Sequence, residues 1–255
     1  MRFELTIKDA DAVPAAVAAL AHRGITAVNV TDTSREIDPV AIGRRLLTEN
    51  PGLDVMVHLS AKHSESASPA ASRNAFSRRL ADCMDAKIRK VLIVSGHPKG
   101  EFDSLAALEV LDAEGFGIDA YCVHNPFLEG TALDEENARI TRKLGNGLVR
   151  GVCFQIGTDL GAIARASTFL RSMRYDIELL GSVPIPDTAM LERLKTKPLF
   201  GVRLPETYLA SAQEAARMTS ETLMQLDAYD IEPLFFTAEL DESTISLALA
   251  LMGKG

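Results

Sequence analysis

The sequence predicts an α/β fold in which eight parallel strands close into a single barrel. Short apolar segments alternate with amphipathic segments along all 255 residues, which is typical of a (β/α)8 TIM barrel. The apolar segments are continuous, as expected for strands covered on both faces. No Gly-x-Gly-x-x-Gly motif follows the first strand, which disfavours an open doubly wound sheet. The length is close to the ~250 residues of a typical barrel, so we expect one catalytic domain over 1–255 without a regulatory domain.

Turn and capping residues delimit the elements of the first half. Gly24 follows an Ala-rich amphipathic segment as a helix C-cap residue, and Asp38-Pro39 supplies an N-cap and a first-turn proline. A polar loop rich in Ser and Ala precedes the third helix. The strands are expected at 3–7, 25–30, 53–59 and 90–94. The helices are expected at 10–23, at 38–50, in a segment ending near 84, and at 103–114.

The second half repeats the alternation and adds a short helix near its end. The strands are expected at 118–123, 151–154, 177–180 and 233–236. The helices are expected at 134–144, 159–173, 187–195, 206–229 and 241–252. Two stretches, Gly181-Ser-Val-Pro-Ile-Pro-Asp187 and Gly201-Val-Arg-Leu-Pro205, frame the short 187–195 helix with prolines. This spacing predicts a βα loop at the mouth of the barrel, the end where the strands finish.

Composition and charge disfavour several classes of function. A net charge of -8 and a pI near 5.2 disfavour a nucleic-acid partner. No apolar run approaches the ~18 residues of a membrane helix, and the N-terminus lacks an apolar signal region, so we expect a cytoplasmic protein with no membrane partner. Cys83, Cys122 and Cys153 are widely spaced and odd in number, which predicts neither a disulfide framework nor a zinc site. No Glu-x-x-His or His-x-His cluster occurs, so no metal centre is expected.

Candidate functional residues follow from the fold, because βα loops converge at the C-terminal ends of the strands. Glu4 stands between Phe3 and Leu5, so its side chain points into the barrel if those two face the helices. A carboxylate in that position is costly unless it is paired or used. The other polar candidates at strand ends are Thr31, Asp32, His58, His63, Ser95, His97, His124, Asn125, Gln155, Asp187, Thr237 and Glu239.

The first and sixth strands carry two short motifs, Phe3-Glu4 and Gly151-Val-Cys-Phe-Gln155. Together with the proline-framed seventh loop, they resemble the methylenetetrahydrofolate reductase family, whose first strand reads Phe-Glu-Phe and whose sixth reads Ile-Thr-Gln. The resemblance covers nearly the whole chain. It implies an oxidoreductase of one-carbon metabolism that reduces 5,10-methylenetetrahydrofolate to 5-methyltetrahydrofolate with NAD(P)H. It also implies that Glu4 is the acid that assists opening of the bridged folate, and that Gln155 binds the pterin edge.

Further residues take roles from the same resemblance. The turn ending in Ser-Gly-His97-Pro resembles the family's Arg-Gly-Asp-Pro, and Thr31-Asp32-Thr33 resembles Val-Thr-Asp, which implies substrate contacts for His97 and Asp32. The implied cofactor contacts are Thr31, His58, His124 and Lys143. From the residues alone, structural roles stay open: a barrel ion pair for Glu4, a strand-end cap for Gln155, a turn-filling role for His97, an Asx-turn at Asp32, a solvated His124 and a helix-terminal charge for Lys143.

The departures from the family fall at its flavin site. His97 stands where the family has an Asp beside the flavin, and Val123 stands where an aromatic Tyr packs. Aromatic packing and charged hydrogen bonds each contribute on the order of 1–3 kcal/mol to a noncovalent complex. We therefore expect a chain that binds NAD(P)H, with FAD absent or weakly bound.

Other classes of function stay open on the sequence. One is a non-catalytic paralogue that binds folate or a protein partner, although Glu4 and Gln155, which a dead enzyme is expected to lose first, are both present. Another is a barrel lyase or aldolase, but no Schiff-base lysine is visible at an inner strand end. The expected ligand is a small folate, and the sequence leaves a homo-oligomer open.

Overall fold

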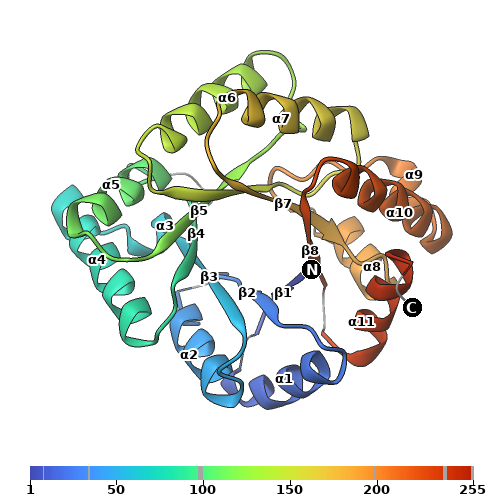
Figure 1. Ribbon diagram of the computed structural model, residues 1–255, viewed down its shortest axis with the longest axis horizontal. Coiled ribbons are helices and arrows are strands. Elements are labelled where there is room, and N and C mark those ends of the chain that lie inside the picture. The colour runs from blue at the N-terminus through green and yellow to red at the C-terminus, as the bar shows by residue number, and fades with distance from the viewer. Residues whose placement is uncertain (8, 34, 97–99, 198, 238–239, 254–255) are drawn as a thin grey trace.

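The described residues of the computed structural model form a closed barrel of parallel strands, as the sequence predicts (Figure 1). They comprise residues 1–255 apart from 8, 34, 97–99, 198, 238–239 and 254–255. Strands pair in chain order, and β8 pairs with β1 to close the barrel. The strands are β1 (Arg2–Leu5), β2 (Ala27–Val30), β3 (Asp54–Ser60), β4 (Lys90–Val94), β5 (Asp119–His124), β6 (Val149–Phe154), β7 (Glu178–Pro184) and β8 (Glu232–Phe236).

A ring of helices surrounds the strands (Figure 1). The ring contains α1 (Val13–His22), α2 (Pro39–Glu49), α4 (Pro69–Asp85), α5 (Ser104–Glu114), α6 (Gly130–Leu144), α7 (Leu160–Ser172), α10 (Ala212–Ala228) and α11 (Glu242–Leu251). Shorter helices lie in the loops that follow strands: η1 (Ala10–Ala12), α3 (Ala61–Ser64), α8 (Thr188–Thr196) and α9 (Glu206–Ala210). No helix in the described part of the chain is long and apolar enough to cross a membrane.

Side-chain caps begin several helices where the sequence predicts them. Asp38 accepts a hydrogen bond from the backbone nitrogen of Val40, and Pro39 occupies the first turn of α2. Asp159 caps α7 and Asp187 caps α8 in the same way. Each cap satisfies a backbone donor that the first helical turn leaves without a partner. The positions of the loops around the mouth are therefore tied to the helix starts.

The main differences between the structure and the sequence prediction lie in three elements. The predicted 206–229 helix is interrupted at Ser211, whose backbone is extended and whose side chain accepts from the backbone nitrogen of Glu214 to cap α10. β7 runs on to Pro184, so 181–184 is strand rather than loop. Gly181 allows this close packing, because an added Cβ would lie 2.6 Å from the Leu226 side chain on α10. α6 begins at Gly130, four residues before the predicted 134–144 helix.

Side chains fill the barrel interior. An apolar middle section consists of Met56, Leu92, Tyr121, Cys153, Leu180 and Leu234. Tyr121 fits there because Gly151 has no side chain: an added Cβ would lie 2.3 Å from the tyrosine ring. At the N-terminal end of the barrel, Arg2 and Lys90 both donate to the Asp54 carboxylate. The interior polar groups at the opposite end form the candidate site.

Candidate active site at the mouth of the barrel

Glu4 lies inside the barrel, as the alternation along the first strand predicts. Its neighbours in register are Asn29 on β2 and Phe236 on β8, while Phe3 and Leu5 face the core between strands and helices. Burial raises the pKa of Glu4 to about 7, against the opposing charge of Arg193. The side chain keeps 16% exposure. Such a carboxyl group holds a proton in a large fraction of molecules at neutral pH and can donate it.

His58 is a neutral neighbour of Glu4 rather than its ion-pair partner. Its Nε2 atom lies 3.9 Å from Oε2 of Glu4, which is beyond hydrogen-bond distance. Burial lowers the pKa of His58 to about 4, outweighing the opposing charge of Asp32. Asn29 accepts from Arg2 through Oδ1, and its Nδ2 atom lies 3.2 Å from Nε2 of His58. Because Oδ1 of Asn29 accepts from Arg2, the amide nitrogen Nδ2 is the atom that donates to Nε2 of His58. The His58 proton is therefore on Nδ1.

The Asp32 carboxylate is buried and engaged by protein donors. It accepts from the backbone nitrogen of Ser60 at 2.7 Å and from Arg79 at 2.6 Å. Its other oxygen lies 2.6 Å from Nδ1 of His63 on α3. The Asp32 side chain is only 1% exposed. The carboxylate therefore joins the second and third loops and orients His63, whose Nε2 atom has no hydrogen-bond partner within the described ranges.

Thr31, the residue before Asp32, ties the end of β2 to the end of β1. Its hydroxyl donates to the backbone oxygen of Leu5 at 3.1 Å, and its oxygen lies 3.3 Å from the Thr6 hydroxyl. Thr31 therefore lies at the mouth close to Glu4, as expected from the strand order. Its side chain is half-buried, and its hydroxyl oxygen still has acceptor capacity.

Gln155 lies at the end of β6, apart from the cluster around Glu4. Its Oε1 atom accepts from the backbone nitrogen of Ile156 at 3.0 Å. Its Nε2 atom lies beside Gly201, where an added Cβ would be 3.5 Å away. Asp159 caps α7 by accepting from Ala162, so the helix start does not depend on Gln155. The Oε1 acceptor of Gln155 is thus engaged by the neighbouring backbone, and the Nε2 donor faces the segment that covers β6.

A covering segment, defined as residues 187–205 and containing α8, closes the β5 to β8 side of the mouth. Asn125 donates to the backbone oxygen of Gly201 at 2.9 Å, and Gly157 pairs with Arg203 in an isolated bridge. The apolar side of α8 packs on the barrel end through a cluster that contains Ile156, Met190, Leu194 and Phe236. The β1 to β3 side, with Glu4 and His58, is not part of these contacts.

His124 and Lys143 lie between β5 and the outer helices, not inside the barrel. His124 is fully buried, its ring packs edge-on to Phe154 at 6.0 Å, and its Nδ1 atom lies 3.7 Å from the Glu136 carboxylate. Lys143 is 5% exposed and donates to the backbone oxygen of Val123 at 3.3 Å. Burial lowers the pKa of Lys143. The structure therefore separates these two predicted cofactor contacts from Thr31 and His58.

The predicted His97 and the candidate Glu239 lie outside the described residues. Within the described ranges, no group of three or more His, Cys, Asp or Glu side chains is arranged to hold a metal ion.

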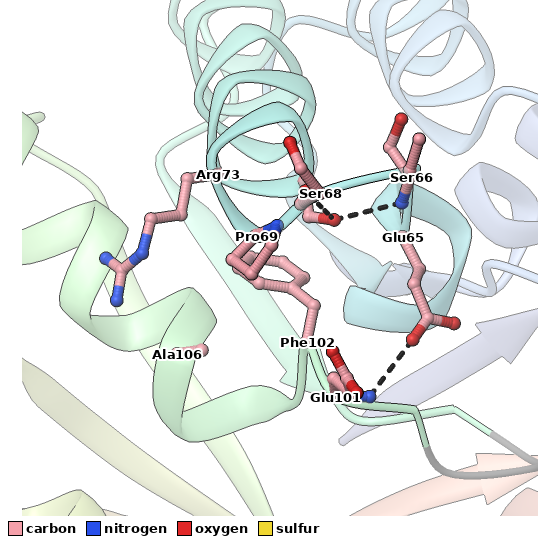
Figure 2. Close-up of a pocket in the computed structure, with 10 residues that line it drawn as sticks. Glu65, Ser66, Ser68, Pro69, Arg73, Glu101, Phe102 and Ala106 are labelled. Carbon is pink, nitrogen blue, oxygen red and sulfur yellow. Dashed lines mark hydrogen bonds between the residues drawn. The ribbon is translucent and has the colours of Figure 1, made fainter.

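Two cavities border the mouth. One, of about 430 Å³, is lined by Glu4, Thr6, Asp9 and Thr237 together with apolar residues of β1 and α1, and its size is in the range of small-molecule sites. The other, of about 230 Å³, lies between the loop before α4 and the start of α5 (Figure 2). Figure 2 shows the Glu65 carboxylate directed at the backbone nitrogen of Glu101. Glu65 also pairs with Lys62, so the Glu65 carboxylate that lines the second cavity already has protein partners.

Sequence reasoning missed Arg193 and Asn29. Asn29 carried a usable signal, since it is a polar residue within an otherwise apolar four-residue strand. Arg193 carried none, because an arginine on an amphipathic helix is ordinary in sequence. The structure places its guanidinium carbon 5.3 Å from the centre of the Phe236 ring, at the mouth.

Comparisons with known proteins show the fold. No protein-family model matches the sequence, and a search of curated proteins found no match. Among solved structures, a Clostridium thermocellum protein that binds two copies of 5-methyl-5,6,7,8-tetrahydrofolic acid matches with a TM-score of 0.73 and 12% identity, over 98% of this chain and 92% of that one. The apo form of Gox0644 matches with a TM-score of 0.59 and 12% identity, over 98% and 82% of the two chains. At these identities the likeness establishes the barrel architecture and not the activity.

Proposed function

We propose that this chain binds a reduced folate at the barrel mouth and reduces 5,10-methylenetetrahydrofolate to 5-methyltetrahydrofolate, with Glu4 as the acid. The observation that carries the proposal is the burial of Glu4, which raises its pKa to about 7 beside a neutral His58. Opening of a bridged folate requires a proton at a ring nitrogen, and a carboxyl group with this pKa can supply it near neutral pH. Folate binding by a protein of the same fold supports the choice of ligand.

The electron donor we propose is reduced nicotinamide, which supplies a hydride when bound. Two of the four predicted cofactor contacts do not fit a flavin in the barrel interior, because His124 and Lys143 lie between β5 and the outer helices and Lys143 donates to a backbone oxygen. The chain's own contribution is to hold a proton on Glu4 and, through Asn29, to orient the His58 ring, which burial keeps neutral. We also propose ligand contacts for Gln155 and for Thr31.

A Glu4→Gln variant tests this function. It should bind 5-methyltetrahydrofolate as the parent does but lose roughly 100-fold or more in turnover, the usual size of a general-acid effect. Glu232→Gln is the matched control, because Glu232 is an inward carboxylate at the opposite end of the barrel, paired with the terminal amine. Turnover within about threefold of the parent would overturn the assignment of Glu4.

A second candidate function is folate binding without reduction. The separation of His124 and Lys143 from the mouth favours it, since two of the cofactor contacts implied by the family are then missing. A parent protein that binds 5-methyltetrahydrofolate but oxidises no NADH or NADPH with the methylene substrate would select this candidate. A lyase of the Schiff-base class gains no support, because the inward Lys90 lies at the end opposite to the mouth and pairs with Asp54.

A further inference from the structure

Arg193 differs from the other arginines that are withdrawn from solvent. Within the described ranges, the arginines that are not exposed are Arg2, Arg79, Arg139 and Arg193. The first three each donate to a carboxylate, that of Asp54, Asp32 and Asp103. Arg193 makes neither a hydrogen bond nor an ion pair with any described residue. Among the described residues, no carboxylate is hydrogen-bonded to Arg193, although its charge acts on the Glu4 carboxyl group.

An aromatic ring holds the Arg193 charge at the mouth. The guanidinium carbon lies 5.3 Å from the centre of the Phe236 ring. Phe236 is buried at the end of β8, in register with Glu4 on β1. A cation on a ring face is held in place, and the Arg193 N–H groups make no hydrogen bond with any described residue. Because a partly buried charge without acceptors is unfavourable, we expect a bound molecule to supply them.

The segment that carries Arg193 contains more basic than acidic residues. The covering segment 187–205 contains four basic residues, Arg193, Lys195, Lys197 and Arg203, and two acidic ones, Asp187 and Glu192. The whole chain, in contrast, carries a net charge of -8. A local excess of positive charge at a concave end attracts anionic ligands and raises their rate of association.

We propose that Arg193 binds a carboxylate or phosphate group of the ligand that occupies the barrel mouth. The planar guanidinium presents paired donors that match either group. The inference rests on the proposed function for the identity of the ligand, and two sources of the anion follow from it: the glutamate carboxylates of a folate and the phosphates of a nicotinamide dinucleotide.

Binding measurements on Arg193→Gln and Arg193→Lys test the proposal. Calorimetric titrations use 5-methyltetrahydrofolate, a tetrahydropterin without the glutamate tail, and NADPH. Arg193→Gln should weaken one anionic ligand by about 10- to 100-fold, the effect of losing charged hydrogen bonds, and Arg193→Lys should give an intermediate value. Arg142→Gln is the matched control, because Arg142 is an exposed arginine without a carboxylate partner in the described part of the chain. It should bind all three ligands as the parent does.

The pattern of weakening identifies the source of the anion. Weaker folate binding with unchanged binding of the tail-free pterin assigns Arg193 to the carboxylate, and weaker NADPH binding alone assigns it to a phosphate. Unchanged binding of all three ligands by Arg193→Gln would overturn the proposal. A change in the pH profile of turnover alone, without weaker binding, would also overturn it. Arg193 would then act only through the effect of its charge on Glu4.

A folate-free probe separates this proposal from the proposed function. If the parent binds neither 5-methyltetrahydrofolate nor NADPH, the proposed function fails. Inorganic pyrophosphate should still protect Arg193, and not Arg142, from modification by phenylglyoxal, as measured by mass spectrometry of peptides. Equal modification of Arg193 with and without pyrophosphate would then overturn the anion site as well.

Discussion

Glu4 is a carboxyl group that folding makes harder to ionise, so its burial makes stability depend on pH. Its pKa is raised from 4.5 to about 7 in the folded chain. Because the folded state holds this proton more tightly, the stabilising contribution is fully present below the unfolded pKa and is lost as the pH rises through about 7. The difference between the two values corresponds to roughly 3 kcal/mol.

We predict that Glu4→Gln abolishes this contribution. Urea denaturation should show the parent losing stability relative to the variant between about pH 5 and about pH 8. His58 acts in the opposite sense: its pKa is lowered from 6.5 to about 4, so its contribution is lost as the pH falls through that range. Both proteins contain His58, so the difference between them isolates Glu4. A difference that stays constant with pH would contradict the raised pKa.

The structure leaves Gln155 fewer groups for a ligand than its sequence motif implies. Oε1 already accepts from Ile156, so the Nε2 donor remains for a ligand. Gln155→Ala should therefore raise the dissociation constant of 5-methyltetrahydrofolate by about tenfold, the value of one hydrogen bond of ~1–1.5 kcal/mol. Titration calorimetry measures this directly, and unchanged affinity would make the glutamine structural.

The individual site residues were predictable to different degrees. Strand alternation was enough to place Glu4 inside the barrel, because period two is a property of any strand. His124 shows the limit: a strand-end histidine can face either side, and the register of β5 turns it toward Phe154 and the helices. The pairing of Asp32 with His63 joins residues 31 positions apart. No local pattern in the sequence encodes such a contact.

At the level of elements, Gly151 on β6 sets the packing of the barrel interior. An added Cβ would lie 2.3 Å and 2.4 Å from two atoms of the Tyr121 ring. We predict that Gly151→Ala destabilises the chain by ~1–3 kcal/mol, the usual effect of overpacking, measured by urea denaturation. Gly117→Ala is the matched control, because nothing lies within 4 Å of its added Cβ. Equal stability of the two variants would contradict a tightly packed interior.

Element boundaries followed the sequence wherever a cap or a run of branched apolar residues marked them. β4 occupies 90–94 as predicted, and Asp38 caps α2. The break at Ser211 was missed because the apolar period continues across it, while the extended backbone of Ser211 and its side-chain cap on the Glu214 nitrogen separate α9 from α10. The extension of β7 to Pro184 depends on its pairing with β8. That is a tertiary contact which glycine and proline in the sequence argue against.

At the scale of the whole molecule, the structure confirms the predicted fold, whereas the cofactor content stays a prediction. Repetition of strand and helix predicts the barrel, since the rule concerns alternation over the entire chain. We predict that the protein purifies without stoichiometric flavin, because Lys143 and His124 lie between β5 and the helix layer and not inside the barrel. An absorbance spectrum of the pure protein checks this. A flavin band near one equivalent per chain would contradict it.

The shape of the mouth was not predictable from the sequence. The covering segment reaches β5 and β6 through Asn125 and Gly157, contacts that depend on where the ends of distant strands meet. The position of Arg193 over Phe236 also depends on how the covering segment packs on the strand ends. Glu4, whose direction follows from the alternation of its own strand, was predicted from the sequence. Arg193, which a long loop places at the mouth, was not.

The three buried thiols give the barrel internal reporters of its own opening. Burial raises the pKa of Cys122 to about 11 and those of Cys83 and Cys153 to about 12, so none is reactive toward alkylating agents while the chain is folded. Cys83 lies on the buried face of α4, Cys122 faces the helix layer from β5, and Cys153 lies in the barrel centre. Timed alkylation followed by peptide mass spectrometry should therefore reveal whether these three regions open together or one after another.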